Sequence, residues 1–435
     1  MILSNMLWVP KEDIAHINSL KSNLTVKPKY DNKENIRTFI ETEDYFGLPR
    51  NYNLVPNDVI DKRVCPKKQN IKFIGKLRPV QQVMIDDWQK LYDAGVDDWI
   101  IEGDTGIGKT VLMIKIACEL GVPFLVVVPL ERLMTQWIDQ IKKFTNIKEV
   151  GIIRQDTCEY EGLASVGMVH SLCKDKYSEE MKNHFGLIIY DEIDKYGSEH
   201  FSKVVSMFPA KHRCGASATL KRQDGTENVY FYHLGRKIIS TETKTQPNPT
   251  IFQFKYNESS GKLPHWIDIY DRIKTRAFLL SQIANNENRN YAIAEFASTL
   301  INKKIQTLVI GDRISQLEEI QKILVEKGHD DTGLYIGKTS DKEKKRIEKE
   351  ASCILATKKM LDVGIDIDTL RGVIFSTPQS NVTQIVGRAR RINPIMPDPI
   401  VIDIVDTAHK DAIRWFENRK KWYVSEGFKI KTIVG

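Results

Sequence analysis

The sequence predicts an α/β protein in which two parallel-sheet domains follow a small α+β accessory domain. From Asp98 onward, short apolar runs rich in β-branched residues alternate with amphipathic stretches, and a second block of the same kind begins after a polar stretch. Strands buried on both faces of a helix-covered parallel sheet give continuous apolar runs of this kind. We place the accessory domain at residues 1–75 and the α/β domains at residues 76–243 and 244–435.

Length and composition set the limits of this interpretation. The 435 residues suffice for two or three domains, and 41% hydrophobic with 28% charged residues is an ordinary globular balance. No apolar run reaches the roughly 20 residues of a membrane span, so we expect no membrane partner. The net charge of +7 permits a polyanionic partner but equally suits a slightly basic soluble protein. The six cysteines form no Cys-x-x-Cys pair, which argues against zinc and suits a reducing, cytoplasmic location.

The accessory domain is expected from its lack of long helical periodicity. Residues 1 to about 75 are rich in Lys, Asn and Pro, with short strand-like pieces at residues 24–26 and 37–40. Such short elements are typical of a small α+β fold.

The first α/β domain is expected to hold strands at residues 99–101, 124–128 and 187–190. Between the first two, residues 109–120 predict a helix that Gly121 and Pro123 end.

The second α/β domain is expected to follow an inter-domain connection. Residues 241–262 are polar and contain Pro247 and Pro249, so we interpret them as that connection. The charged stretch 341–350 predicts a solvated helix face. The apolar runs predict strands at residues 307–310, 353–356, 373–375 and 400–402, with Asp403 and Asp406 as ordinary acids after the last strand.

A glycine-rich segment lies between the first predicted strand and its helix. Its sequence, Gly103-Asp104-Thr105-Gly106-Ile107-Gly108-Lys109-Thr110, matches the phosphate-loop pattern completely, in the strand-to-helix context that the pattern requires. Glycines let backbone N–H groups face phosphates, and the helix N-terminus adds the positive end of its dipole. We therefore expect ATP at Gly103, Thr105, Gly106 and Gly108, with Lys109 on the β and γ phosphates and Thr110 on Mg²⁺.

An acidic segment follows the strand predicted at residues 187–190. Asp191-Glu192-Ile193-Asp194 stands at the carboxyl edge of that strand, where open α/β sheets bind ligands. Alone, an acidic strand end is in most proteins a solvated loop. Beside a phosphate loop it predicts a nucleoside triphosphatase, with Asp191 holding Mg²⁺ and Glu192 orienting and deprotonating the attacking water.

Further segments resemble, in the expected order, the motifs of superfamily 2 helicases over about residues 75–406. Residues 77–81 resemble the adenine-reading element, which implies nucleotide contacts from Arg78 and Gln81. Residues 217–219 resemble the coupling motif, which implies that Ser217 and Thr219 link hydrolysis to movement. The resemblance implies two RecA-like motor domains that use ATP to move on nucleic acid.

Two segments of the second block resemble motifs V and VI of the same helicases. Motif VI is expected to supply arginines that neutralise the charge of the transition state, an effect worth roughly 10³ to 10⁵ in rate. Since these arginines come from the second domain, catalysis would require closure of the two domains. The residues implied are Gly364, Asp366 and Gln384 as nucleotide contacts and Arg388 and Arg391 as catalytic arginines.

The resemblance also implies where nucleic acid is held. Residues 129–137 resemble the first strand-tracking motif, and the implied contact residues are Arg132, Ser171, Arg313 and Thr357. Contacts to phosphates and sugars predict binding that is largely independent of base sequence and is weakened by salt.

The kind of nucleic acid is indicated by one departure from the large RNA-helicase groups and by resemblances to other helicases. Asp-Glu-Ile-Asp differs from their Asp-Glu-Ala-Asp and Asp-Glu-x-His forms, and residues 217–225 resemble the segment around the Arg-Glu-Asp motif of XPB-like DNA helicases, with Gln223 replacing the glutamate. Residues 24–29 and 41–52 resemble the segment before the motor in XPB-like, poxviral and phage helicases.

The compact size and the lack of appended regulatory domains favour a phage-type enzyme, located in the host cytoplasm. The resemblance to such enzymes implies that its partner is branched or forked DNA. Tyr45, Phe46 and Tyr52 of the accessory domain are candidates for stacking on bases, although each is more typical of the core of a small domain. The alternatives are an RNA-directed or transcript-release helicase, a double-stranded DNA translocase that does not separate strands, and an inactive scaffold.

Overall fold

The computed structural model describes residues 1–29, 34–52, 58–103, 106–196, 199–222, 224–240, 247–257, 272–362, 367, 369–379, 382–390 and 396–434. The chain divides into two compact units, Met1–Thr243 and Lys244–Gly435. No helix among the described residues is long and apolar enough to cross a membrane. Thr105, Gly364, Asp366 and Arg391 lie outside the described residues, as does Gln223.

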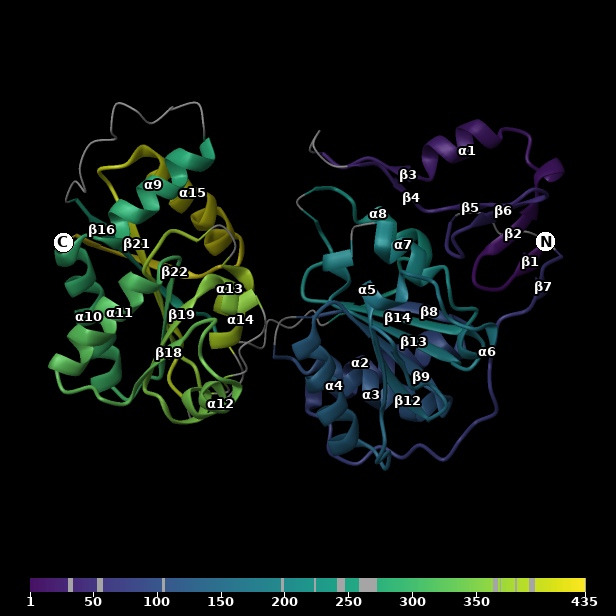
Figure 1. Ribbon diagram of the computed structural model, residues 1–435, viewed down its shortest axis with the longest axis horizontal. Coiled ribbons are helices and arrows are strands. Elements are labelled where there is room, and N and C mark those ends of the chain that lie inside the picture. Colours follow the sequence, from purple (N-terminus) through teal and green to yellow (C-terminus); the bar gives the residue numbers. More distant parts are fainter. Residues whose placement is uncertain are drawn as a thin grey trace. The chain divides into compact units, whose positions relative to one another are not determined.

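The first unit is built on an eight-stranded sheet with the order β11-β10-β12-β9-β13-β14-β8-β15 (Figure 1). Neighbouring strands are parallel except β10 and β11. The strands are β8 (Asp98–Glu102), β9 (Phe124–Val128), β10 (Gly151–Arg154), β11 (Thr157–Cys158), β12 (Ala164–Met168), β13 (Leu187–Asp191), β14 (His212–Ser217) and β15 (Ile238–Ser240). The predicted parallel sheet is confirmed, and the strands expected at 99–101, 124–128 and 187–190 are β8, β9 and β13.

Helices cover both faces of this sheet, which explains why its strands are apolar throughout. Ile101 and Val126 face a core shared with α2 (Pro79–Asp93), α3 (Lys109–Leu120) and α4 (Glu131–Phe144). Their neighbours Ile100 and Val127 face a second core, which is shared with α5 (Val169–Leu172), α6 (Glu179–Lys182), α7 (Glu199–Val205) and α8 (Asn228–Leu234).

The second unit repeats this architecture with seven parallel strands in the order β18-β19-β17-β20-β21-β16-β22. The strands are β16 (Thr250–Tyr256), β17 (Thr307–Gly311), β18 (Thr332–Tyr335), β19 (Cys353–Thr357), β20 (Gly372–Phe375), β21 (Ile400–Asp406) and β22 (Lys429–Val434). The helices are α9 (Arg272–Ala284), α10 (Glu287–Asn302), α11 (Ile314–Glu326), α12 (Asp341–Glu350), α13 (Lys358–Asp362), α14 (Thr383–Ala389) and α15 (Lys410–Ser425).

Two expectations for the second unit are wrong. Residues 241–262 are not simply a connection, because residues 250–256 form β16 between β21 and β22, where Ile251 is fully buried. Asp403 and Asp406 do not follow the last strand but lie inside β21. Both are buried, and each binds an arginine: Asp403 Oδ1 lies 2.7 Å from Arg419 Nη2, and Asp406 Oδ1 lies 2.6 Å from Arg289 Nε.

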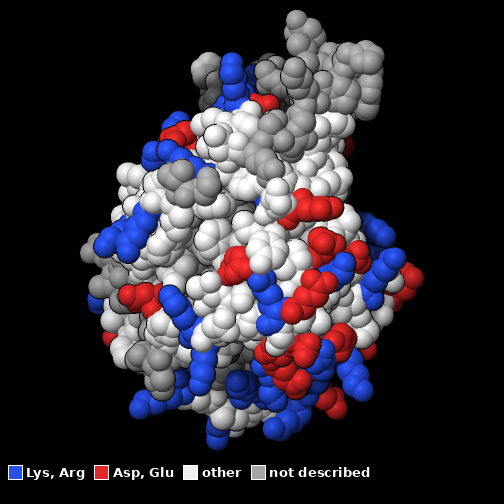
Figure 2. Space-filling view, turned by 90° about the vertical axis from the view of Figure 1, so that its left-hand side faces the viewer, with Lys and Arg blue, Asp and Glu red and all other residues white. Residues whose placement is uncertain are grey.

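The surface of the second unit shows no single sign of charge on the face seen in Figure 2. Lys and Arg side chains lie there among Asp and Glu side chains. Within the second unit, ion pairs such as Lys327 with Glu295 and Arg346 with Glu343 bring opposite charges together. The described residues visible in Figure 2 therefore form no continuous basic stripe of the kind that marks a strong polyanion track.

The N-terminal residues form a small sheet of their own within the first unit. Its order is β5-β6-β2-β1-β7, and a separate hairpin pairs β3 with β4. Leu7, Val9, Leu24, Phe46 and Leu48 form its core. The elements are β1 (Ile2–Leu3), β2 (Leu7–Pro10), α1 (Ile17–Asn23), β3 (Thr25–Val26), β4 (Ile36–Arg37), β5 (Ile40–Glu41), β6 (Tyr45–Leu48) and β7 (Ile60–Asp61). We call residues 1–75 the accessory segment.

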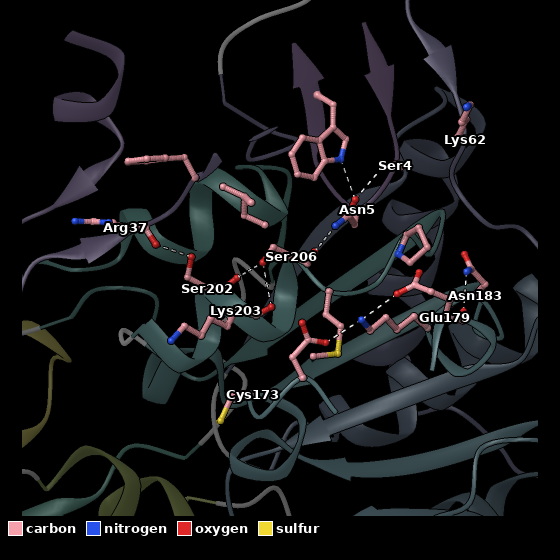
Figure 3. A pocket seen from close by; sticks show the side chains of 17 residues that line it. Ser4, Asn5, Arg37, Lys62, Cys173, Glu179, Asn183, Ser202, Lys203 and Ser206 are labelled. Carbon is pink, nitrogen blue, oxygen red and sulfur yellow. Dashed lines mark hydrogen bonds and ion pairs between the residues drawn. The ribbon is translucent and has the colours of Figure 1, made fainter. Parts of the chain in front are cut away.

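The accessory segment packs on the face of the main sheet that carries α7 and α8. Val26 and Ile36 of its hairpin join the core beneath those helices. Beside this contact the surface is hollowed by a groove of about 820 Å³, which side chains of the accessory segment, α6 and α7 line (Figure 3).

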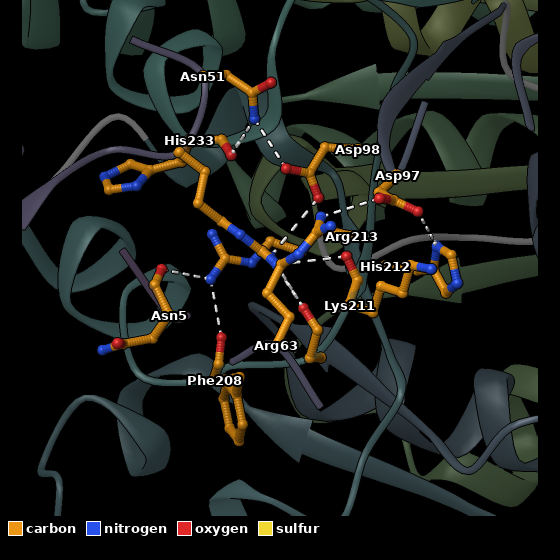
Figure 4. Close-up of polar contacts among 12 residues, drawn as sticks. Asn5, Asn51, Arg63, Asp97, Asp98, Phe208, Lys211, His212, Arg213 and His233 are labelled. Carbon is orange, nitrogen blue, oxygen red and sulfur yellow. Dashed lines mark hydrogen bonds and ion pairs between the residues drawn. The ribbon is translucent and has the colours of Figure 1, made fainter. Parts of the chain in front are cut away.

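A buried polar network ties the accessory segment to the main sheet (Figure 4). Arg213 of β14 is fully buried and donates to the carbonyl oxygen of Asn5 at 2.6 Å. Asn51 donates to Asp98 Oδ2 at 2.8 Å, and Arg50 Nη1 lies 3.7 Å from Asp98 Oδ1. Burial lowers the pKa of Arg50 to about 9. Removal of one side chain from this network would leave its charged or polar partner buried without a compensating contact.

Candidate nucleotide site

Three neighbouring strands of the first unit bring the predicted ATP-site segments together. In the order β13-β14-β8, the strands end at Asp191, Ser217 and Glu102, and the phosphate loop begins at the next residue, Gly103. The N–H of Gly103 donates to the carbonyl oxygen of Ser217 at 3.2 Å. Because parallel strands end at the same edge, the loop, the acidic pair and the coupling segment share one edge of the sheet.

The described part of the phosphate loop has the conformation that its glycines permit. Gly106 and Gly108 have φ values of 92° and 86°, in a region that other residues rarely adopt. Gly108 immediately precedes α3, whose first two residues are Lys109 and Thr110. Lys109 Nζ donates to the carbonyl oxygen of Gly103 at 2.6 Å, so the ammonium group lies within the curve of the loop.

The side chains of Arg78 and Gln81 donate hydrogen bonds to backbone carbonyl groups of the loop. Arg78 Nη2 donates to the carbonyl oxygen of Gly106 at 3.0 Å and also to that of Ile107. Gln81 Nε2 donates to the carbonyl oxygens of Ile107 and Gly108 at 3.1 and 3.2 Å. A Cβ atom on Gly108 would lie 2.3 Å from Gln81 Nε2, so the Gln81 side chain would have to move, and the φ of 86° by itself favours glycine at this position.

Asp191 is buried and Glu192 is partly buried, and one partner of this pair was not foreseen. The indole Nε1 of Trp137, on α4, donates to Asp191 Oδ2 at 2.8 Å. Burial raises the pKa of Asp191, while the Trp137 hydrogen bond and the nearby Lys109 lower it. The sequence carried no sign of this contact, because Trp137 looked like part of a strand-tracking motif.

Glu192 has the features of a side chain whose carboxylate group binds a ligand. Burial and the adjacent Asp191 raise the pKa of its carboxyl group. Its Oε2 is buried and has no hydrogen-bond partner among the described residues. Its φ of 55° is left-handed, a strained conformation that is concentrated at functional sites. A buried, unpartnered carboxylate oxygen beside Asp191 and Lys109 fits a site for a divalent cation, water and phosphate.

The coupling segment is connected to the acidic one by a short hydrogen bond. Ser217 Oγ donates to Asp194 Oδ1 at 2.7 Å and accepts from the N–H of Thr219 at 3.2 Å. Ser217 therefore contacts both the phosphate loop, through its carbonyl group, and the acidic segment, through its side chain.

The predicted nucleic-acid contact residues differ in their exposure and in their hydrogen bonds. Arg132 is partly exposed in the first turn of α4, and Thr357 is partly exposed at the end of β19. Ser171 is buried, and its Oγ accepts the N–H of Gln155 at 2.9 Å. Arg313 donates to Ser281 Oγ and to the carbonyl oxygen of Ala277 on α9.

The motif VI segment forms α14 in the second unit. Arg388 lies on this helix, whereas the side chain of Gln384 is outside the described part of the chain. Arg390 is buried and lies 3.4 Å from Glu426, with its guanidinium over the ring of Phe428. Its contacts are those of a residue that stabilises the fold.

Comparison with known proteins places this geometry in a family. Residues 74–222 match the family described as "Type III restriction enzyme, res subunit", and residues 289–393 match "Helicase conserved C-terminal domain". L396 of Acanthamoeba polyphaga mimivirus, whose name assigns it to the ATP-dependent RNA helicases, is 31% identical over 96% of this chain and 86% of its own. D10 of Escherichia phage T5, named as a helicase, is 25% identical over 87% of this chain and 81% of its own.

A solved structure supports the fold. Dbp5 of S. cerevisiae, bound to RNA and ADP BeF3, matches with a TM-score of 0.55 at 13% identity, over 82% of this chain and 90% of that chain. The chain belongs to the helicases of superfamily 2. It resembles the phage-type members of that superfamily, and membership implies the use of ATP with a divalent metal.

The Trp137 contact leads to a first prediction. Trp137→Phe keeps an aromatic ring in the core but removes the N–H that holds Asp191, so the carboxylate is less well oriented and harder to ionise. Loss of such a supporting hydrogen bond typically costs about 10- to 100-fold in metal affinity. We expect Mg²⁺-dependent binding of a fluorescent ATP analogue to need about tenfold more Mg²⁺.

Trp88→Phe is the matched control for this variant. Trp88 is buried in the same core, and its Nε1 has no hydrogen-bond partner among the described residues. If the two variants have the same Mg²⁺ requirement, the Trp137 contact serves packing alone.

Proposed function

We propose that this helicase acts on DNA, and that its preferred substrates are branched: forks and four-way junctions whose arms it separates, migrates or regresses. Lys109 and the glycines of the loop would hold the triphosphate, Thr110 and Asp191 would bind Mg²⁺, and Glu192 would position and deprotonate the attacking water. The divalent ion would neutralise charge on the phosphates. In this proposal Arg388 and Arg391 keep their predicted role of neutralising the charge that develops in the transition state.

The observation that carries this proposal is the fixed position of the accessory segment on the first unit. A motor that only pulls a strand needs no second surface, whereas work on a junction needs one that holds another arm. The buried contacts of Arg213 with Asn5 and of Asp98 with Asn51 make the accessory segment a rigid neighbour of the ATP-binding sheet. Such a neighbour can hold an arm at a constant offset from the motor.

The aromatic residues that were candidates for base stacking do not share one setting. Phe46 is fully buried in the accessory core and stacks on Phe39 with ring centroids 5.0 Å apart. Tyr52 packs edge-on against Tyr232 of α8 at 5.2 Å. Tyr45 is 38% exposed. Phe46 therefore serves the core, and Tyr45 is the member of the three with the most surface open to a base.

A second candidate is an RNA-directed helicase. The specific observation in its favour is the name of the mimivirus relative, which has 31% identity to nearly the whole chain.

The two candidates are separated by the rate of ATP hydrolysis in the presence of matched nucleic acids. The full chain would be assayed with single-stranded DNA, duplex DNA, a four-way DNA junction and an RNA duplex at equal nucleotide concentration and fixed salt. We expect the junction to give the largest stimulation at limiting concentration, because it can contact the motor and the accessory segment together. Stronger stimulation by the RNA duplex than by every DNA would establish the RNA-directed alternative instead.

A further inference from the structure

The groove beside the accessory segment lies apart from the nucleotide-site residues and is made by two parts of the first unit (Figure 3). One wall comes from the accessory segment, and the other comes from α6, α7 and the residues after α5 and α7. A second hollow of about 350 Å³ continues along the accessory segment. Arg37 and Phe39 line both hollows, so together they form one continuous surface, which we call the accessory groove.

The accessory groove is rich in basic side chains. Arg37, Lys62, Lys182 and Lys203 line the larger hollow, and Lys21 and Lys27 line the smaller one. Each of its three acidic side chains binds a lysine: Lys182 binds both Asp175 and Glu179, at 2.9 and 3.1 Å, and Lys21 binds Glu41 at 2.8 Å. Six cations therefore face three acids along the groove.

Three of the cations remain available to a ligand. The side chains of Lys27, Arg37 and Lys62 are exposed, and no partner for them is found among the described residues. Their charges therefore point to a polyanion.

Two partly exposed aromatic rings lie in the same groove. The indole ring of Trp8 packs against Gly47, where an added Cβ atom would lie 3.0 Å from the ring. Its Nε1 donates to Asn5 Oδ1 at 3.0 Å, which fixes the ring. Phe39 is supported by its stack on Phe46. Each ring is therefore held in place while part of it lines the groove.

We propose that the accessory groove binds a single strand of nucleic acid, with Arg37 and Lys62 on its phosphates and the rings of Trp8 and Phe39 against its bases. Basic grooves with interspersed aromatic rings bind single strands in this way, because every base has a face that stacks. An acidic peptide would use the cations but not the rings, and a duplex would keep its bases from them.

The position of the groove gives this strand a path toward the motor. Cys173 lines the groove and directly follows α5, which carries the predicted contact residue Ser171. A strand in the groove therefore lies beside an element that is expected to face nucleic acid. The inference deepens the proposed function, on which it rests, because it names the surface that holds one arm of the branch.

The test is the salt dependence of single-strand binding by the full chain. Each lost phosphate contact should reduce the slope of log affinity against log salt concentration by about 0.7. For the double variant Arg37→Ala/Lys62→Ala we expect a reduction of about 1.4 for labelled oligo-dT and an affinity on the order of tenfold lower at low salt. An oligo-U arm tests whether the groove distinguishes DNA from RNA.

The matched control is Lys142→Ala/Lys148→Ala. Both lysines are exposed, and Lys142 belongs to α4, which covers the opposite face of the sheet. All four substituted side chains are exposed, so thermal melting should show native stability for both double variants, and ATP hydrolysis without nucleic acid should not change.

A second measurement reports the rings directly. A single strand carrying 5-iodouracil, irradiated in complex with the native chain, should form cross-links to peptides that contain Trp8 or Phe39. Equal salt slopes for both double variants, or cross-links confined to peptides of the motor, would refute the groove as a strand site. That result would leave the proposed function standing if junctions still stimulate hydrolysis, whereas failure of all DNA to stimulate would remove the proposed function itself.

Discussion

Glu192→Gln is expected to reduce nucleic-acid-stimulated ATP hydrolysis by at least about 100-fold while nucleotide binding and thermal stability stay near those of the native chain. The substitution keeps the size of the side chain but removes the carboxylate whose buried Oε2 has no partner among the described residues. The loss would therefore come from water positioning and proton transfer, and not from packing.

Lys109→Ala should lose hydrolysis to a similar extent but also lose affinity for nucleotide. Lys109 supplies the cation inside the loop, where its Nζ lies 2.6 Å from the carbonyl oxygen of Gly103. Steady-state hydrolysis and the binding of a fluorescent ATP analogue, measured together, separate the two variants.

Two changes on α3 serve as controls. Lys115 and Glu119 form an ion pair on the same helix, so Lys115→Ala and Glu119→Gln alter charge near the site without touching the loop. These variants should hydrolyse ATP at close to the native rate. Near-native turnover by Glu192→Gln or Lys109→Ala would contradict the assignment of the site.

The second large effect concerns the stability of the first unit. Asp98→Asn should lower the free energy of unfolding by about 3–5 kcal/mol, because it leaves buried cations without their nearest carboxylate. The side chain of Asp98 is 8% exposed and lies between Asn51 and Arg50 of the accessory segment. Urea unfolding followed by tryptophan fluorescence measures the change.

Asp93→Asn is the control, since Asp93 is exposed at the end of α2, where it accepts a hydrogen bond from Gln89. The same network predicts that a chain starting near residue 76 fails to fold, because it lacks the carbonyl group and side chains that Arg213 and Asp98 contact. A truncated chain that melts at the native temperature would show that the accessory segment does not contribute to the stability of the rest of the first unit.

The main sheets could be predicted because their strands are buried on both sides. β9 and α3 have the bounds expected from the sequence, since continuous apolar runs and the Gly108 and Gly121 boundaries leave few alternatives. β16 was not predicted because Pro247 and Pro249 precede it and because its polar Gln253 and Lys255 are typical of a connection. Only pairing with strands far along the chain makes that segment a strand.

The site, too, could be predicted only in part. The loop and the acidic pair could be predicted because each is a motif of consecutive residues. The Trp137 hydrogen bond to Asp191 joins residues on different elements, and so does the contact of Arg78 with the loop. Such contacts depend on how helices pack on the sheet, which no spacing in a single sequence reveals.

The place of β16 in its sheet has a consequence for biosynthesis. Both of its neighbours, β21 and β22, are made much later than β16 itself. While the ribosome is still translating the middle of the second unit, β16 has two open edges that can pair with other nascent chains. Production of this protein should therefore respond to the speed of translation and to chaperones that shield exposed strands, even where the finished fold is stable.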